Sequence, residues 1–284
     1  QVQAEWRMHS GGRKLRLRME LRQSFVDSKL VVLKAGTSIL TNKDGSPSLT
    51  RIANIVENAC RLIRGGKQVI LVTSGAVGMG RMRLKKQRML RKTLSAALVD
   101  GGDKTGHDEA VTGEERSVYD SAAAAAGQMS LFALYEMLFA NHDVCTSQLL
   151  VTSFDFHSEE RRKNIHHVLT SLLELQVVPI INENDAISGN QGYQTFGRHF
   201  SDNDALASLV SRTVAADALL LLTDVEGVFD RDPREEGAQL LDTFEADTEY
   251  EAGTKSIKGR GGIQAKVDSA VAAVEGGVRA VAVA

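Results

Sequence analysis

The chain has 284 residues, of which 43% are hydrophobic and 25% charged, so it is long enough to bury a substantial core, as one large α/β domain or two smaller ones. Its formal net charge of −2 gives no whole-chain attraction for nucleic acid. No apolar run reaches the roughly 20 residues of a membrane-spanning helix, so neither nucleic acid nor a membrane is expected as a partner.

The first 28 residues form a basic leader that lacks the apolar segment of a secretory signal. We expect residues 1–28 to be disordered or loosely attached, with the remnant of an organelle transit peptide as the alternative. The basic residues of this leader are Arg7, Arg13, Lys14, Arg16, Arg18 and Arg22.

From Lys29 onward, short β-branched apolar runs alternate with helix-length segments. Unbroken apolarity indicates strands that are covered on both faces, which is typical of a mostly parallel sheet between layers of helices. We therefore expect an α/β fold, an αβα sandwich, in one domain over residues 29–284. The predicted strands are Leu30–Leu33, Gln68–Thr73, Val144–Val151, Val177–Ile181, Ala218–Thr223 and Val278–Val283.

Glycine-rich polar segments follow the first two strands, where ligands bind in open α/β sheets. Lys34 and Gly36 follow the first strand, and an ammonium group beside a glycine suits a phosphate, although a strand-end lysine without such a role is equally compatible. Ser74, Gly75 and Ala76 open a helix after the second strand. The free N–H groups of a helix start can bind a carboxylate or phosphate, and an ordinary N-cap serine is the alternative.

Two segments of biased composition come next. Arg81–Lys92 has seven basic residues in twelve, and Asp100–Asp120 is rich in acids and glycines. Because the basic stretch lacks the interleaved aromatics of a nucleic-acid site, we expect a solvated helix followed by a mobile loop. The alanine-rich stretch Ser121–Gly127 predicts the start of a buried helix.

Two cysteines, Cys60 and Cys145, stand without the Cys or His spacing of a metal site. Both are expected to be buried thiols in a reducing compartment. We expect a cytoplasmic location, with a mitochondrion or plastid as alternatives.

Amides and carboxylates gather at two places in the second half of the chain. Asn182–Asp185 ends the fourth strand, and Ser201–Asp204 precedes a helix expected at Ala205–Arg212. Such groups suit an α-amino group and a metal-bound nucleotide, while helix capping explains the second cluster equally well. Three histidines, for which surface or packing roles are expected, are His166, His167 and His199.

The last third carries an acidic turn at Thr223–Pro233 and a glycine-rich segment, Gly259–Lys266, that opens a helix. This segment is neither a Walker A loop, because no Gly-Lys-Ser/Thr occurs there, nor a dinucleotide fingerprint. With Lys34 near one end of the chain and Lys266 near the other, we expect one phosphoryl group to be held from two sides.

In order along the chain, these segments resemble the motifs of the glutamate 5-kinases of the amino acid kinase family, including the kinase half of the Δ1-pyrroline-5-carboxylate synthases. The resemblance covers about Lys29 to Ala284. The matching motifs are Lys34–Ser38, Thr73–Ala76, Ala124–Gln128, Leu134–Glu136, Ile181–Ala186, Asp202–Asp204, Leu222–Pro233 and Gly261–Lys266.

The resemblance implies phosphorylation of the γ-carboxylate of L-glutamate by ATP with Mg²⁺, the first step of proline synthesis, in a homo-oligomer (dimer or tetramer) inhibited by proline. It implies that Lys34 and Lys266 stabilise the transferring phosphoryl group and that Asp204 orients them, and it assigns no metal ligand. The residues implied for glutamate are Ser74, Gly75, Ala76, Asn182, Asp185 and Asn203. Those implied for ATP are Lys34, Gly36, Thr223, Asp224, Gly259, Arg260, Gly261, Gly262, Ile263, Gln264, Ala265 and Lys266.

The chain departs from the family pattern in its nucleotide loop and at its end. Arg260 stands where the family has a small hydroxyl residue, and Ile263 stands in place of a methionine. The family continues past the position of Ala284 with a glycine-containing loop and a last strand, so we expect the domain to be truncated at its C-terminus. The alternatives are a sister kinase acting on aspartate, N-acetylglutamate, carbamate or UMP, and an inactive amino-acid-binding regulator.

Overall fold

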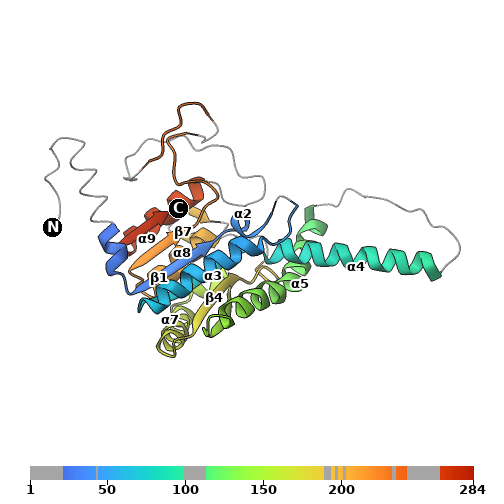
Figure 1. The fold of residues 1–284 in the computed structure, drawn as a ribbon, viewed down its shortest axis with the longest axis horizontal. Helices are drawn as coiled ribbons and strands as arrows, with labels where there is room; N and C mark the ends of the chain where they lie inside the picture. The colour runs from blue at the N-terminus through green and yellow to red at the C-terminus, as the bar shows by residue number, and fades with distance from the viewer. Residues whose placement is uncertain are drawn as a thin grey trace.

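A parallel sheet of six strands forms the centre of the structure (Figure 1). The computed structural model describes residues 22–42, 44–98, 113–188, 193–195, 198–200, 203–231, 235–241 and 263–284, with the backbone alone at 92–98, 113–117, 193–195 and 198–200. Neighbouring strands of the sheet all pair in parallel. In spatial order they are β3 (Thr146–Val151), β4 (Val178–Glu183), β2 (Gln68–Thr73), β1 (Leu30–Ala35), β7 (Ala218–Leu221) and β8 (Ala280–Val283).

Each predicted strand is one strand of this sheet, with ends that differ by at most two residues. β1 illustrates why these strands are unbroken apolar runs. Val31 and Leu33 contact one layer of helices and Val32 contacts the other, so neither face of the strand meets water. The predicted α/β fold, with a mostly parallel sheet between helices, is confirmed.

Helices α3 and α5 cover one face of the sheet, and α4 packs along α5 (Figure 1). α3 is amphipathic: Ile52, Val56 and Ala59 lie on one side at helical spacing and are buried, which fixes the face that it turns to the sheet. The helices of this layer and its connections are α2 (Thr37–Leu40), α3 (Leu49–Arg64), α4 (Ala76–Leu98) and α5 (Gly113–Ala140).

The opposite face of the sheet is covered by α7, α8 and α9. α7 begins after Ser158, whose hydroxyl accepts a hydrogen bond from the Arg161 N–H, and it buries Ile165, Leu169 and Leu173, four residues apart. The predicted helix Ala205–Arg212 is the middle of α8. The bounds on this side are α6 (Ser153–His157), α7 (Glu159–Glu174), α8 (Asn203–Thr213) and α9 (Ile263–Glu275).

A short antiparallel hairpin was not predicted. It joins β5 (Tyr193–Thr195) to β6 (Arg198–Phe200) between β4 and α8. Strands of three residues are too short to show the alternating pattern by which half-buried strands are identified in a sequence.

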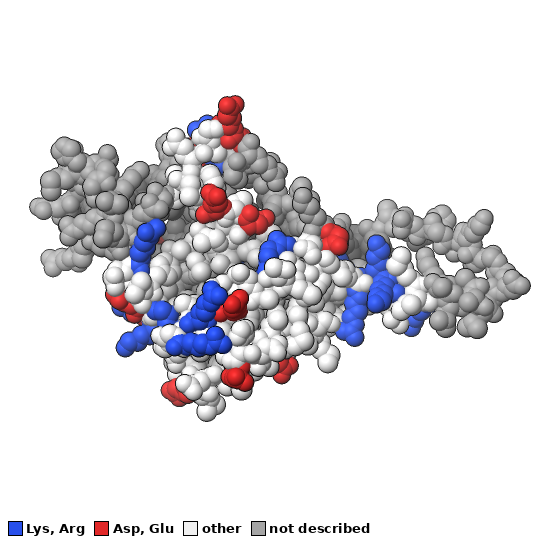
Figure 2. Space-filling model, in the orientation of Figure 1, with Lys and Arg blue, Asp and Glu red and all other residues white. Residues whose placement is uncertain are grey.

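α4 extends beyond the sheet, and lysine and arginine side chains gather on its projecting part (Figures 1 and 2). The predicted solvated helix is confirmed over the residues whose side chains are described. Two of its arginines also hold α5. Arg81 forms a two-pronged ion pair with Asp120, and Arg83 donates to the Ala126 carbonyl and to the Ser130 hydroxyl.

Two glycines let α4 and α5 touch through their backbones. A Cβ on Gly80 would lie 1.7 Å from the Ala123 carbonyl oxygen, and one on Gly127 would lie 2.0 Å from the Ala76 carbonyl oxygen. Neither position has room for a side chain. The alanine-rich stretch of α5 therefore serves close helix packing.

The helix α5 begins earlier than predicted. Ser121–Gly127 lies in its interior rather than at its start, because the helix reaches back to Gly113. The C-terminal part of the predicted Asp100–Asp120 loop is therefore helical, and residues 99–112 lie outside the described part of the chain.

One described helical segment, Val118–Ala140 of α5, is long and apolar enough by length and composition to cross a membrane. The sequence prediction missed it because alanines interspersed with polar residues do not form an unbroken apolar run. In the fold, the segment buries Leu131, Tyr135 and Phe139 in the core against the sheet, which is the position of a core helix in a globular domain.

Part of the predicted leader packs on the domain. Residues 22–27 form a helical turn, and Phe25 packs against the core. The Lys67 ammonium group donates to the carbonyls of Phe25, Val26 and Ser28. Residues 22–28 are therefore attached to the domain, and residues 1–21 lie outside the described part.

The two cysteines differ in environment. Cys60 is buried in α3, as predicted, and burial raises the pKa of its thiol. The prediction of a buried thiol at Cys145 is wrong: this residue is exposed. It precedes β3, which lies at the edge of the sheet and has a neighbouring strand on one side only.

Candidate active site

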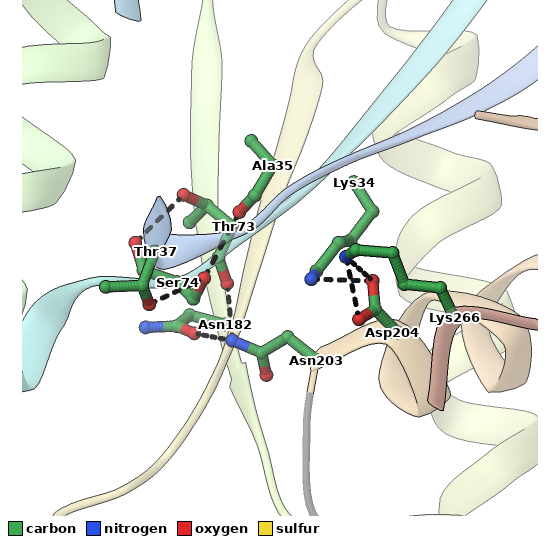
Figure 3. A network of polar contacts seen from close by, with 9 residues as sticks. All are labelled: Lys34, Ala35, Thr37, Thr73, Ser74, Asn182, Asn203, Asp204 and Lys266. Atoms are coloured by element: carbon green, nitrogen blue, oxygen red, sulfur yellow. Dashed lines mark hydrogen bonds and ion pairs between the residues drawn. The ribbon is translucent and has the colours of Figure 1, made fainter. Parts of the chain in front are cut away.

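Two ammonium groups from opposite ends of the chain meet on one carboxylate (Figure 3). Lys34 Nζ lies 2.6 Å from Asp204 Oδ1, and Lys266 Nζ lies 3.1 Å from Asp204 Oδ2 and 3.2 Å from Oδ1. Lys34 is inside β1 rather than after it, because β1 stays paired with β2 as far as Ala35. Asp204 stands in the first turn of α8 and Lys266 in the first turn of α9.

All three charged groups are buried. The exposed fraction is 4% for Lys34, 1% for Asp204 and 9% for Lys266. Burial by itself raises the pKa of the Asp204 carboxyl, but the two ammonium groups outweigh it and hold that pKa below its ordinary value. With Asp204 ionised and both lysines protonated, the group carries one positive charge in excess, which favours an incoming anion.

A pair of asparagine amides lies beside these charges. Asn182 is the second-last residue of strand β4. Asn203 begins α8 directly before Asp204, so the amide pair and the ion pairs are adjacent (Figure 3). Asn203 Nδ2 donates to Asn182 Oδ1 at 3.0 Å and to the Thr73 carbonyl at 2.8 Å. Asn182 Nδ2 donates to Gln128 Oε1 at 2.7 Å.

The turns after β1 and β2 are joined by hydroxyl groups (Figure 3). Ser74 Oγ donates to the Ala35 carbonyl at 3.2 Å and lies 3.3 Å from Thr37 Oγ1. Gly75 has a φ of +105°, a left-handed conformation that favours glycine and turns the chain into α4. The predicted residues Ser74, Gly75 and Ala76 thus follow β2, the strand next to β1, and lie at the same end of the sheet as Lys34.

Gly36 has a role that the sequence did not predict. Its φ of −82° can be adopted by any residue, so the backbone conformation does not require a glycine at this position. A Cβ at this position would lie 3.0 Å from Lys34 Nζ, so the missing side chain leaves room for the ammonium group.

The residues predicted for the nucleotide are only partly described. Thr223 follows β7. The Leu222 N–H donates to the Lys34 carbonyl, which places this turn at the same carboxyl end of the strands as Lys34. Asp224 is exposed. Ile263, Gln264, Ala265 and Lys266 begin α9, whereas Gly259, Arg260, Gly261 and Gly262 lie outside the described residues.

Of the residues predicted for glutamate, Asp185 lies in the turn after β4 and is half-buried. Ser201 and Asp202 of the second cluster lie outside the described residues. His166 and His167 are exposed on α7, in agreement with the predicted surface role, and the side chain of His199 is not described. The described residues contain no group of three His, Cys, Asp or Glu side chains that could hold a metal ion.

Two residues that support the site belong to motifs matched in the sequence, but no role was predicted for them. Gln128 contacts Asn182, and the buried Tyr135 hydroxyl lies 3.0 Å from Thr73 Oγ1, next to Ser74. Both come from α5, far from the strands in the sequence. The motifs Ala124–Gln128 and Leu134–Glu136 could be matched in the sequence, but only the packing of α5 on the sheet shows what these two side chains contact.

Comparison with known proteins agrees with the predicted family. A profile of the amino acid kinase family matches residues 29–284. Delta-1-pyrroline-5-carboxylate synthase 1 of Oryza sativa subsp. japonica is 40% identical over 260 residues, which cover 90% of this chain and 34% of that protein. Glutamate 5-kinase of Clostridium perfringens is 34% identical over 269 residues, 91% of this chain and 88% of that protein. Glutamate 5-kinase of Paraburkholderia phymatum is 36% identical over 266 residues, 92% and 63% of the two chains.

The chain thus spans about a third of the length of the plant synthases that it matches and nearly the whole of the clostridial kinase. The matched part runs through all six strands of the parallel sheet and includes Lys34, Asp204 and Lys266.

Proposed function

Because this chain belongs to the amino acid kinase family, we propose that it transfers the γ-phosphoryl group of ATP to the γ-carboxylate of L-glutamate and forms L-glutamyl 5-phosphate, the first step of proline synthesis. One observation carries the proposal: Lys34 and Lys266 meet on Asp204, directly beside the amide pair of Asn182 and Asn203. A cation site for a phosphoryl group and a polar site for an amino acid therefore lie next to each other.

The reaction needs positive charge rather than a base. A glutamate γ-carboxylate, with an ordinary pKa of about 4.3, is already ionised and nucleophilic at neutral pH. The obstacle is repulsion between this carboxylate and the negatively charged phosphates. In phosphoryl transfer the protein supplies positioning and charge stabilisation, and here the Lys34 and Lys266 ammonium groups would face the oxygens of the transferring group.

Asp204 would hold the two lysines in place before and during transfer. Its carboxylate accepts hydrogen bonds from both ammonium groups in a site that water hardly reaches, so their positions are set without the substrate. Such preorganised charge stabilises a transition state more than mobile charge in water does.

The amino acid would bind between the turn after β2 and the amide pair. The Ser74 hydroxyl and the N–H groups at the start of α4 suit a carboxylate, because a helix start carries partial positive charge. Asn182, Asp185 and Asn203 suit the polar groups at the α-carbon.

ATP would bind at the start of α9 and at the turn of Thr223 and Asp224. Mg²⁺ belongs to the proposal as the ion that accompanies the phosphates of ATP, since it is commonly bound through one or two carboxylates and substrate phosphates. When bound, it neutralises charge on the phosphate oxygens.

The purified chain tests this function directly. With ATP, Mg²⁺, glutamate and hydroxylamine it should form γ-glutamyl hydroxamate, because hydroxylamine traps an acyl phosphate. Product with aspartate or N-acetylglutamate but not glutamate, or ADP release only with carbamate or UMP, would assign a sister kinase. Glutamate binding in calorimetry without product from any acceptor would contradict catalysis and indicate an amino-acid-binding regulator.

We also propose that the protein is a cytoplasmic homo-oligomer, a dimer or tetramer, and that proline inhibits it. Light scattering after size-exclusion chromatography measures the oligomeric state, and the hydroxamate assay with added proline measures inhibition. A monomer, or activity unchanged by millimolar proline, would contradict the respective part.

A further inference from the structure

The orientation of the two site amides is fixed by backbone groups. The Glu183 N–H can only donate, and it donates to Asn182 Oδ1 at 2.9 Å. The Thr73 carbonyl can only accept, and it accepts from Asn203 Nδ2 at 2.8 Å. Neither amide can exchange its oxygen and nitrogen without placing two donors or two acceptors against each other.

This orientation leaves one acceptor at the site without a partner. Both hydrogens of Asn203 Nδ2 are used, one on the Thr73 carbonyl and one on Asn182 Oδ1. Asn203 Oδ1 is turned away from these partners (Figure 3), is buried, and has no hydrogen bond from any residue that the structure describes. Because a buried acceptor without a donor is unfavourable, Asn203 is prepared for a ligand that brings an N–H group.

Gln128, on α5, is the last member of the same chain of hydrogen bonds, next to Asn182. With Asn182 Oδ1 facing Glu183 and Asn203, the Nδ2 group of Asn182 points the other way and donates to Gln128 Oε1 at 2.7 Å. Gln128 thereby holds the one donor of Asn182 that has no other partner in the described chain and keeps its side chain from rotating.

The close backbone contact between α4 and α5 brings Gln128 within hydrogen-bonding distance of Asn182. Its neighbour Gly127 lies so close to α4 that a Cβ would be 2.0 Å from the Ala76 carbonyl oxygen. A larger residue at position 127 would move α5 away from the start of α4, and with it Gln128 from Asn182.

We propose that Gln128 is a positioning residue: it holds Asn182 and Asn203 so that Asn203 Oδ1 accepts a hydrogen bond from the α-ammonium group of the amino-acid substrate. This inference rests on the proposed function and adds to it the residue that sets recognition of the amino group. Gln128 itself is not required to touch the substrate.

The test compares glutamate with glutarate, which has the same two carboxylates but no amino group. In Gln128→Met, a side chain of similar size can no longer accept from Asn182. We expect KM for glutamate to rise about tenfold, the effect of losing roughly 1.4 kcal/mol of binding, with KM for ATP and kcat within about threefold. The inhibition constant of glutarate against glutamate should stay within about twofold.

Gln87→Met, at an exposed position of α4, is the matched control and should change none of these constants. Gln128→Ala gives a second measurement if the methionine variant does not fold, and the same pattern is expected. The wild type alone provides a third measurement: if the inference is right, it binds glutamate at least tenfold more tightly than glutarate.

Some results would overturn the inference while leaving the kinase activity intact. These are equal weakening of glutamate and glutarate binding in both Gln128 variants, or a wild type that binds the two acids equally well. Unchanged KM for glutamate in both variants would also overturn it. A wild type that forms no γ-glutamyl hydroxamate would instead refute the proposed function, on which the inference rests.

Discussion

Lys34, Asp204 and Lys266 lie in three distant parts of the sequence and share one buried contact. A buried ion pair is weak evidence for stability, because removal of charge from water offsets much of the attraction. Two cations on one anion lie here at the carboxyl ends of the strands, where ligands bind in open α/β sheets. This arrangement is better explained by a need for positive charge in the site.

Removal of either ammonium group should slow catalysis. In Lys34→Ala and in Lys266→Ala we expect kcat to fall on the order of a hundredfold or more, with a modest change in KM for glutamate, because the lysines would act mainly on the transition state. The hydroxamate assay measures both constants. Lys163→Ala, which removes an exposed lysine paired with Glu159, is the control. Near-wild-type turnover in either site variant would refute the assigned role.

The charge of Asp204 should stabilise the fold in a pH-dependent way. Its folded-state pKa lies below that of the unfolded chain, so ionised Asp204 stabilises the fold at every pH above the unfolded value, about 3.9. This stabilisation is lost as the pH falls from there through the lowered folded-state pKa.

In Asp204→Asn two buried ammonium groups lose their counter-charge, and we expect the free energy of unfolding to fall by about 3 kcal/mol at pH 7. In urea titrations, the difference from the wild type should be constant between about pH 5 and 8 and shrink below about pH 4. A difference that grows on acidification would contradict the assigned direction of the pKa shift.

At the level of elements, α5 connects the helical layer to the site. It carries Gln128 to β4 and Tyr135 to the end of β2, and both contacts depend on how closely α5 packs against α4 and the sheet. The glycines at the α4–α5 contact are therefore expected to matter for stability as well as for the site.

Two glycines of α4 allow a matched comparison. In Gly80→Ala the new methyl group meets the backbone of Ala123, and we expect the free energy of unfolding to fall by about 3 kcal/mol. In Gly78→Ala, two residues away, the methyl group meets nothing within 4 Å, so the greater helix propensity of alanine should stabilise the fold by about 0.5 kcal/mol. Urea midpoints measure both effects, and equal effects would show that close helix packing is not the cause.

At the scale of the whole molecule, the first and last strands of the described chain lie on either side of β7 in the sheet. β1 lies between β2 and β7, and β8 pairs with β7 on the far side. Asp217 joins these parts at the end of the sheet opposite the site, since it accepts from the N–H groups of Lys29 and Leu30 and pairs with Arg279. Burial raises the pKa of Asp217, but these partners outweigh it and hold that pKa below its ordinary value.

Asp217→Ala should therefore destabilise the domain more than Arg279→Ala. The first variant removes the acceptor that the N–H groups of Lys29 and Leu30 share at the start of a central strand, and we expect a loss of about 2 kcal/mol. The second removes only an exposed ion pair, and we expect less than about 1 kcal/mol. The comparison uses urea unfolding at pH 7, and an equal loss in both variants would show that the ion pair is the main contact.

Much of the fold could be predicted because it depends on local patterns. Strands that are covered on both faces are apolar throughout, so all six could be placed within two residues. The pattern failed for the short β5–β6 hairpin and for the start of α5, where alanine and polar residues give no clear periodicity. It also failed for Cys145, because exposure at a sheet edge depends on the order of the strands.

By itself, the sequence determined the α/β class, the family and the residue types at the strand ends, since each is expressed in neighbouring residues. The family resemblance already implied that Asp204 orients Lys34 and Lys266. Only the tertiary structure showed that both ammonium groups contact this carboxylate directly and that Gln128 supports Asn182. Such contacts join residues that are 54 to 170 positions apart in the sequence (204 − 34 = 170). They depend on strand order and helix packing, which involve the whole chain at once and leave no local pattern.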